Sequence, residues 1–296
     1  MEWRKGRRSD NVVDARGEGG GGGGMRFGGG KGLGLGAILL IVGIGWLTGQ
    51  DPLQILGQLA GQMEQQQQTA PANVGGKAPP ANDEQAEFVA SILGDTEDTW
   101  KALFAQAGKQ YRDPKLVLFS GQVNSACGFA SSAVGPFYCP GDQRVYLDMT
   151  FFREMETRFK AAGDFAQAYV IAHEIGHHVQ TLLGVSAKVD AARRNGQRME
   201  GDNGLLVRQE LQADCLAGVW AYQAQKRLNW LEPGDVEEAL NAANAIGDDR
   251  LQQQGQGRVV PDSFTHGTSQ QRVRWFKAGF SSGDVNSCDT FAARSL

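Results

Sequence analysis

Apolar and polar positions divide the chain into about eighty N-terminal residues without a globular pattern and a patterned remainder. Apolar residues recur at helical spacing in residues 84–106, 151–159, 165–184, 203–227, 235–252 and 269–280. The runs KLVLFSG (115–121) and RVYLDM (144–149) are short and rich in β-branched and aromatic residues, which predicts two strands. The pattern therefore predicts an α+β domain over residues 82–296 that is mainly helical with a small β-sheet.

The apolar stretch at residues 32–49 carries no charge, and as a helix it would be about 27 Å long, close to the thickness of a bilayer core. Lys and Arg are frequent before this stretch, and none follows it until Lys77. We therefore expect a disordered, basic, Gly-rich cytoplasmic tail at 1–31, a single transmembrane helix at 32–49, and a domain on the far side of a bacterial inner membrane, in the periplasm. A cleaved signal peptide is the alternative, and it would export the same domain.

Residues 50–81 are rich in Gln, Pro and Ala, which is typical of a linker between the bilayer and the domain. The formal net charge of −4 gives no sign of the basic surface that nucleic-acid binding requires. The sequence does not determine the oligomeric state.

Four cysteines, Cys127, Cys139, Cys215 and Cys288, are compatible with an exported domain that holds up to two disulfides. Four cysteines allow three pairings. A bond between Cys127 and Cys139 would close a short loop and leave Cys215 to pair with Cys288. Four separate buried thiols are the alternative. No C-x-x-C pattern occurs, so zinc binding by cysteine pairs is not expected.

Three of the four histidines lie in the apolar helical stretch at 165–184. On a helix, His173 and His177 lie about 40° apart around the axis and can reach one metal ion. Glu174 lies about 100° from His173, near enough to take a proton from a hydrolytic water, and the pattern H-E-x-x-H is typical of zinc proteases. His178 points elsewhere and is expected to be structural or exposed, while Gly176 leaves room between the two ligand turns or for a neighbouring helix. A surface helix with titrating histidines would not have such apolar flanks.

A catalytic zinc takes three protein ligands and keeps a position for water. The third ligand is either His266, the remaining histidine, or a carboxylate. Glu210 and Asp214 lie four residues apart on one face of a very apolar helix, where carboxylates are costly without a cation. We expect Glu210 to bind the metal and Asp214 to accept a hydrogen bond from a ligand histidine. Pairing of these carboxylates with Arg208 or Arg250 is the alternative.

Four segments together resemble the bacterial neutral zinc metallopeptidases that carry an N-terminal membrane anchor: AYVIAHEIGHHVQ (168–180), VYLDMTFF (145–152), ELQADCLAGVW (210–220) and DSFTHGTSQQRVRWF (262–276). The resemblance covers nearly the whole predicted domain and the apolar stretch, and it implies a zincin-like fold. The pattern E-x-x-A-D is also similar to that of gluzincins of the HtpX and prenyl-protein peptidase type, in which this glutamate binds zinc. Those gluzincins place a histidine and a downstream arginine near the active site, which implies that His266 and Arg274 are active-site neighbours, although His266 is followed here by Gly267 instead of proline.

These observations predict a membrane-anchored zinc endopeptidase that binds one zinc ion per chain and hydrolyses a peptide or protein substrate. Glu174 would act as general base and then as general acid. The oxyanion donor would be His266, with Tyr146 or Tyr169 as alternatives, and strand 144–149 would offer an edge for an extended peptide. The alternative function is an inactive, zinc-stabilised binding or scaffold module at the membrane.

Overall fold

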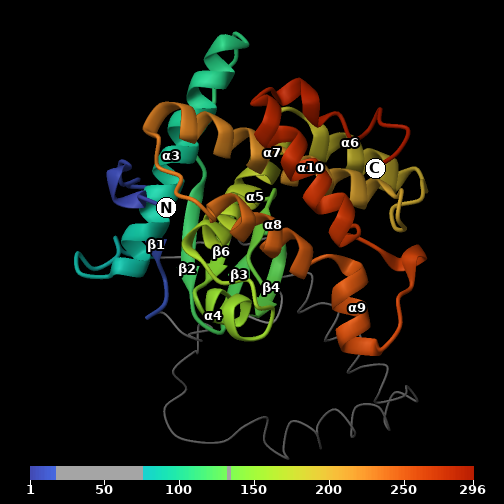
Figure 1. Ribbon diagram of the computed structural model, residues 1–296, viewed down its shortest axis with the longest axis horizontal. Coiled ribbons are helices and arrows are strands. Elements are labelled where there is room, and N and C mark those ends of the chain that lie inside the picture. The colour runs from blue at the N-terminus through green and yellow to red at the C-terminus, as the bar shows by residue number, and fades with distance from the viewer. Residues whose placement is uncertain (18–75, 132–134) are drawn as a thin grey trace, which may run out of the picture.

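The computed structural model describes residues 1–17, 76–131 and 135–296 (Figure 1). Its strands are β1 (Val12–Asp14), β2 (Lys115–Phe119), β3 (Gln122–Ser125), β4 (Gly128–Ser131), β5 (Phe137–Cys139) and β6 (Arg144–Asp148). Its α-helices are α3 (Glu84–Gln106), α4 (Thr150–Thr157), α5 (Asp164–Leu182), α6 (Val185–Arg194), α7 (Leu205–Leu228), α8 (Asp235–Ala245), α9 (Asp248–Gln256) and α10 (Ser269–Ser282). The predicted α+β arrangement with a small sheet is confirmed.

The main sheet has four strands in the order β1-β2-β6-β5. β1, β2 and β6 are parallel, and β5 pairs antiparallel with β6 at the edge of the sheet. Successive side chains of β2 point to opposite faces. Leu116 and Leu118 belong to the large helical core, whereas Val117 and Phe119 pack with the β3–β4 hairpin in a smaller cluster. The sheet is thus covered by helices on one face and by a hairpin on the other.

Helix α5 lies in the middle of the molecule, between the sheet and the pair formed by α7 and α10 (Figure 1). Most of its residues are buried, as its apolar sequence predicts. Gly184 follows its end with a φ of 80°, a conformation that glycine adopts without steric cost, and the chain turns there into α6. The helix predicted to carry the H-E-x-x-H motif is therefore an interior helix.

Several elements differ from the sequence-based prediction. The helix expected at 235–252 is two helices, α8 and α9, which are separated at Ile246 and Gly247. The strand at 144–149 is not an edge, because β6 has a partner on each side, and the edge on this side of the sheet is the unpredicted strand β5. Strands β3 and β4 and helix α6 were not predicted either.

Residues 1–17, which were predicted to belong to a disordered tail, are part of the fold. Val12–Asp14 form β1, and Trp3 is buried against α3. The buried carboxylate of Glu97 in α3 accepts hydrogen bonds from Ser9 Oγ at 2.5 Å and Asn11 Nδ2 at 2.8 Å. The basic residues Arg7 and Arg16 also bind carboxylates of the domain, those of Glu97 and Asp83, so this segment is not a free tail.

The predicted transmembrane helix at 32–49 and most of the predicted linker lie outside the described residues. Within residues 1–17, 76–131 and 135–296, no helix combines the length and the apolar character needed to cross a bilayer. The sheet also joins β1, which precedes the apolar stretch, to β2, which follows it. A chain that crossed a membrane once between them would leave two paired strands on opposite sides. The prediction of a single-pass inner-membrane protein with a cytoplasmic N-terminus is therefore wrong, and the bilayer is not a supported partner.

Two disulfides join the four cysteines, as predicted. Cys127 in the β3–β4 turn is bonded to Cys139 at the end of β5, and Cys215 of α7 is bonded to Cys288. The first bond attaches the edge strand to the hairpin. The second attaches α7 to the C-terminal segment.

Helices α7 and α10 approach each other closely through two glycines. A Cβ atom on Gly218 would lie 2.1 Å from the carbonyl oxygen of Phe276, and one on Gly279 would lie 1.9 Å from that of Cys215. Glycine inside a helix costs about 0.5–1 kcal/mol relative to alanine. The close approach explains why glycine occupies both positions.

We therefore predict that Gly279→Ala lowers the free energy of unfolding by roughly 1–3 kcal/mol, because the added methyl group must push the two helices apart. Gly255→Ala in α9 is the matched control, since nothing lies within 4 Å of a Cβ atom built there. This control should be neutral or stabilising, by up to about 1 kcal/mol. Chemical denaturation of both variants measures the difference, and equal stability would contradict the packing argument.

Candidate metal centre

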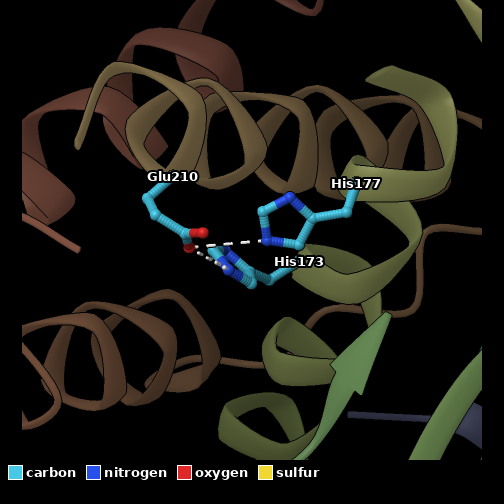
Figure 2. Close-up of side chains that lie close together, drawn as sticks. All are labelled: His173, His177 and Glu210. Carbon is cyan, nitrogen blue, oxygen red and sulfur yellow. Dashed lines mark hydrogen bonds and ion pairs between the residues drawn. The ribbon is translucent and has the colours of Figure 1, made fainter. Parts of the chain in front are cut away.

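Three ligand-type side chains converge from two helices. His173 and His177 are one turn apart on α5, and Glu210 projects from α7 toward both rings (Figure 2). Glu210 Oε2 lies 3.1 Å from His173 Nε2 and 3.4 Å from His177 Nε2. Of the two candidates for a third ligand, Glu210 joins this group, and His266 does not.

The close approach of α5 and α7 makes this convergence geometrically possible. Gly176 lies between the two ligand turns, and a Cβ atom there would be 3.0 Å from the carbonyl oxygen of Ala213. Ala213 is three residues after Glu210 on α7. A larger residue at Gly176 would hold α7 farther away and withdraw Glu210 from the histidines.

The observed separations match those between ligands of one zinc ion. Zinc binds His nitrogen and carboxylate oxygen at about 2.0–2.2 Å, so neighbouring ligands of a tetrahedral ion lie about 3.3 Å apart. The two distances from Glu210 Oε2 bracket that value. The donor set of two imidazoles and one carboxylate also suits zinc. The residues therefore fit the ion.

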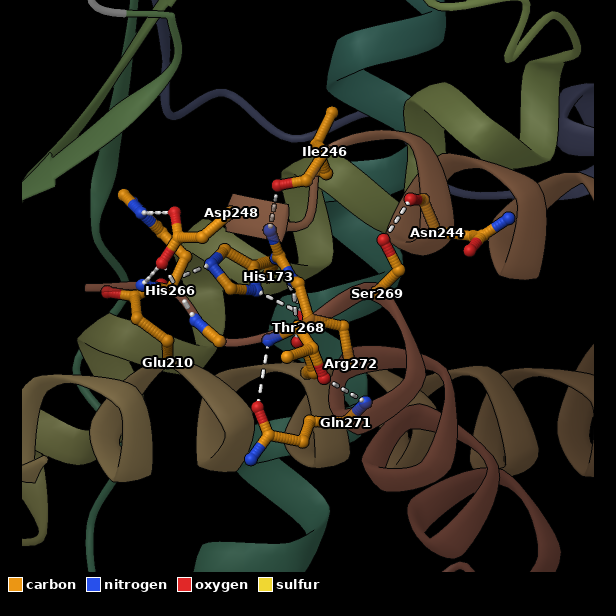
Figure 3. Close-up of polar contacts among 12 residues, drawn as sticks. His173, Glu210, Asn244, Ile246, Asp248, His266, Thr268, Ser269, Gln271 and Arg272 are labelled. Atoms are coloured by element: carbon orange, nitrogen blue, oxygen red, sulfur yellow. Dashed lines mark hydrogen bonds and ion pairs between the residues drawn. The ribbon is translucent and has the colours of Figure 1, made fainter. Parts of the chain in front are cut away.

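Asp214 binds His173 on the side away from Glu210. His173 Nδ1 lies 2.8 Å from Asp214 Oδ1, and Tyr169 Oη donates to the same oxygen at 2.5 Å. Arg272 of α10 donates to both carboxylate oxygens of Asp214 at 2.9 Å. Figure 3 shows Arg272 beside His173. An ionised carboxylate only accepts, so Nδ1 carries the ring hydrogen and Nε2 is left to face Glu210. Asp214 thus accepts a hydrogen bond from His173, and its role beside a metal ligand stays a prediction.

The charges of the site are set by these contacts. Burial alone would raise the pKa of Asp214, but the positive charge of Arg272 and the hydrogen bonds that Asp214 accepts lower it to about 2. Burial likewise opposes ionisation of Glu210, yet the adjacent histidines hold its pKa well below the usual range. Burial would lower the pKa of His173, and the two carboxylates raise it to about 10 instead. The site thus favours positive charge between its carboxylates, and a metal ion can take the place of the protons.

Gln180 orients the second histidine, and the sequence did not single it out. His177 Nδ1 lies 2.9 Å from Gln180 Oε1. The Gln180 amide nitrogen donates to the carbonyl of Gln209 and to the side chain of Gln212, which fixes the orientation of the amide. His177 Nδ1 therefore donates to Gln180, and its Nε2 faces Glu210 as that of His173 does.

His266 lies in the same cavity, on the loop before α10, and is half-exposed. Its Nδ1 lies 2.9 Å from Thr265 Oγ1 and 3.3 Å from Asp248 Oδ1, while Asp248 Oδ2 accepts the backbone N–H groups of residues 265, 266 and 267 (Figure 3). Burial would lower the pKa of His266, but the Asp248 hydrogen bond and the charge of Glu210 raise it. Asp248 thus holds the loop and leaves Nε2 available to a substrate.

Three other predicted neighbours do not face the site. Arg274 donates to the carbonyl oxygen of Leu296, and Arg272 occupies the place expected for it. The hydroxyl of Tyr169 is buried and bound to Asp214, and that of Tyr146 donates to Asp142 at 2.7 Å. Neither tyrosine is placed to donate to a substrate, and His266 is the candidate that lines the cavity.

The cavity in front of these residues has a volume of about 570 Å³ and includes Glu174 in its wall. Phe151 and Phe159, whose ring centroids are 6.5 Å apart, form an apolar part of the wall beside α4. The loop into β5 and the strand itself form another part. The candidate metal-ligand group of His173, His177 and Glu210 therefore opens onto a cavity with space for a substrate.

Comparison with known proteins identifies the family of this chain. The family described as "Putative neutral zinc metallopeptidase" matches residues 1–291. The uncharacterized protein YpfJ of Escherichia coli K12 is 52% identical over 292 residues, which cover 98% of this chain and 99% of the relative. An uncharacterized protein of Mycobacterium tuberculosis H37Rv is 49% identical over 207 residues, 67% of each chain. No solved structure gives a significant match. The chain belongs to the neutral zinc metallopeptidase family.

Proposed function

We propose that this protein is a zinc-dependent endopeptidase that binds one zinc ion through His173, His177 and Glu210. The observation that carries the proposal is the separation of Glu210 Oε2 from the two Nε2 atoms, which fits a shared tetrahedral ion. Zinc held there would supply Lewis acidity that activates water and polarises the scissile carbonyl. The family membership supports a peptide or protein substrate.

The side chains around the ligands have the placement that peptide hydrolysis needs. Glu174 lines the cavity beside both histidines and accepts a proton from the attacking water, then delivers it to the departing amine. His266, held at Nδ1 by Asp248, donates from Nε2 to the developing oxyanion in the protonated form of its ring, which Asp248 and Glu210 favour by raising its pKa. Gln180 orients His177 directly, and Arg272 acts indirectly because it holds Asp214, which orients His173.

The edge strand β5 is the surface on which an extended peptide would lie. β5 ends the sheet beside the cavity, so its outer backbone groups can pair with a peptide by strand addition. The neighbouring Phe151 and Phe159 suit an apolar side chain of that peptide. β6, which the sequence suggested for this role, is enclosed between β2 and β5.

An open ligand group distinguishes an enzyme from a scaffold. A structural zinc site is closed by four protein ligands, whereas a catalytic site keeps a position for water. Within the described residues, the group around His173 has three members and faces a cavity that also contains Glu174. These observations favour the peptidase over a zinc-stabilised binding module.

The first prediction for the site concerns metal content. Wild-type protein should hold one zinc per chain, and Glu210→Ala should lose it or bind it much more weakly, because two histidines remain. His266→Ala is the control and should keep its zinc. Elemental analysis after dialysis measures all three proteins. Zinc retained by Glu210→Ala but lost from His266→Ala would move the third ligand to His266, and no zinc in the wild type would end the enzyme proposal.

Gln180→Ala should weaken zinc binding roughly 10- to 100-fold, the usual effect of losing a residue that orients a ligand histidine. Gln209→Ala is the matched control, since its side chain also lines the cavity and its backbone carbonyl, which Gln180 contacts, is retained. Competition with a metal chelator measures both affinities. Equal affinities in the two variants would show that Gln180 does not orient His177.

Glu174→Gln should reduce hydrolysis of fluorescently labelled casein at least about 100-fold while zinc content stays near one per chain, because the amide cannot accept the proton. Glu154→Gln, a change in the wall of the same cavity, should keep most activity. Activity that survives in Glu174→Gln would refute the general-base assignment.

A further inference from the structure

His178 follows a proposed metal ligand directly, but both of its ring nitrogens bind residues outside the proposed ligand group. Its side chain is fully buried, and it lies between Arg112 and Tyr138. His178 Nε2 is 2.6 Å from the carbonyl oxygen of Arg112, and its Nδ1 is 3.1 Å from Tyr138 Oη. A carbonyl can only accept, so Nε2 carries the hydrogen and Nδ1 accepts from the Tyr138 hydroxyl. The ring therefore uses both nitrogens to hold other parts of the chain.

Tyr138 is the middle residue of β5, the strand at the cavity. β5 is three residues long and pairs with one neighbour, β6. Among its other contacts in the described part of the chain are the Cys127–Cys139 disulfide to the β3–β4 hairpin and the hydrogen bond of the Tyr138 hydroxyl to His178 of α5. Of these two, the Tyr138 hydrogen bond is the one that ties the strand to the helix that carries the metal ligands.

We propose that His178 and Tyr138 are positioning residues for the peptide substrate, which fix the edge strand β5 relative to the metal-binding helix. This inference rests on the proposed peptidase function. Adjacent residues on a helix point about 100° apart, so His177 faces the cavity while His178 reaches the strand that forms its wall. One turn of α5 thus positions both the proposed metal ligand His177 and, through Tyr138, the edge strand β5 on which the peptide would lie.

The consequence is that loss of the Tyr138–His178 hydrogen bond should weaken peptide binding without weakening metal binding. Without the hydrogen bond, the candidate ligand group keeps its own contacts to Asp214 and Gln180, whereas β5 loses a polar attachment to α5 and keeps its short ladder, the disulfide and its ring contacts. A displacement of 1 Å in a positioning element can cost on the order of 100-fold in rate. Recognition of an extended peptide should therefore weaken, and recognition of a small chelator should not.

Tyr138→Phe tests this with the full chain loaded with zinc. Affinity is measured for acetohydroxamate, which engages the metal alone, and for a tripeptide hydroxamate with leucine next to the chelating group. We expect affinity for the tripeptide hydroxamate to fall at least about 5-fold and that for acetohydroxamate to stay unchanged. Hydrogen exchange at residues 137–139 should become several-fold faster.

Tyr111→Phe is the matched control. Tyr111 is also buried, and its ring centroid lies 5.6 Å from that of His178, compared with 5.5 Å for Tyr138. Within the described residues its hydroxyl has no hydrogen-bond partner, so its removal should change neither affinity nor exchange. A neutral Tyr111→Phe beside a weakened Tyr138→Phe assigns the effect to the hydrogen bond.

The outcomes separate this inference from the function on which it rests. Unchanged tripeptide affinity and unchanged exchange in Tyr138→Phe would overturn the positioning role. Equal weakening of both hydroxamates would also overturn it, because the hydrogen bond would then act on the metal site. A wild-type protein that binds neither zinc nor acetohydroxamate would refute the peptidase proposal itself.

Discussion

The contact between Gly176 of α5 and Ala213 of α7 sets the separation of the two helices that carry the candidate metal ligands. At this distance Glu210 reaches both histidines, and the ligand atoms lie at the spacing of a shared ion. The same spacing places Asp214, one turn farther along α7, against the other nitrogen of His173. The candidate metal-ligand group and the carboxylate of Asp214 beside it thus depend on one helix contact, which only a small residue permits.

Asp214 then imposes a requirement on the rest of the core. A fully buried carboxylate stays ionised only if cations or several donors compensate for the loss of water. Arg272 supplies that charge, and it also donates to the carbonyl of Ile246, two residues before Asp248. The approach of α10 that brings Arg272 inward depends on Gly218 and Gly279. The glycines, the buried ion pair and the His266 loop therefore form one connected arrangement.

The sequence predicted those features that follow from local periodicity. The H-E-x-x-H spacing and the position of Glu210 and Asp214 on one helix face required only helical geometry, and the structure brings these side chains together. Arg274 was named only from the resemblance to gluzincins. In the structure Arg272 of α10 points inward to Asp214, and Arg274, two residues later and about 200° around the helix, binds Leu296 instead. The direction of the Tyr146 and Tyr169 hydroxyls depends on tertiary contacts, which no local pattern encodes.

The errors at the N-terminus have a similar cause. Glycine and basic residues indicated a free tail, yet three residues suffice for β1 because β2 supplies the partner strand. Neither VVD nor FYC is long enough to show the alternation by which strands are recognised, so both edges of the sheet were missed. The adjacent pair His177 and His178 could be assigned to different directions from sequence, but the partner of His178 could not, because Tyr138 lies in one of these short strands. Helical phase shows that the two side chains point in different directions. Only the folded sheet shows that His177 faces the cavity and that His178 contacts Tyr138 in the wall of the same cavity.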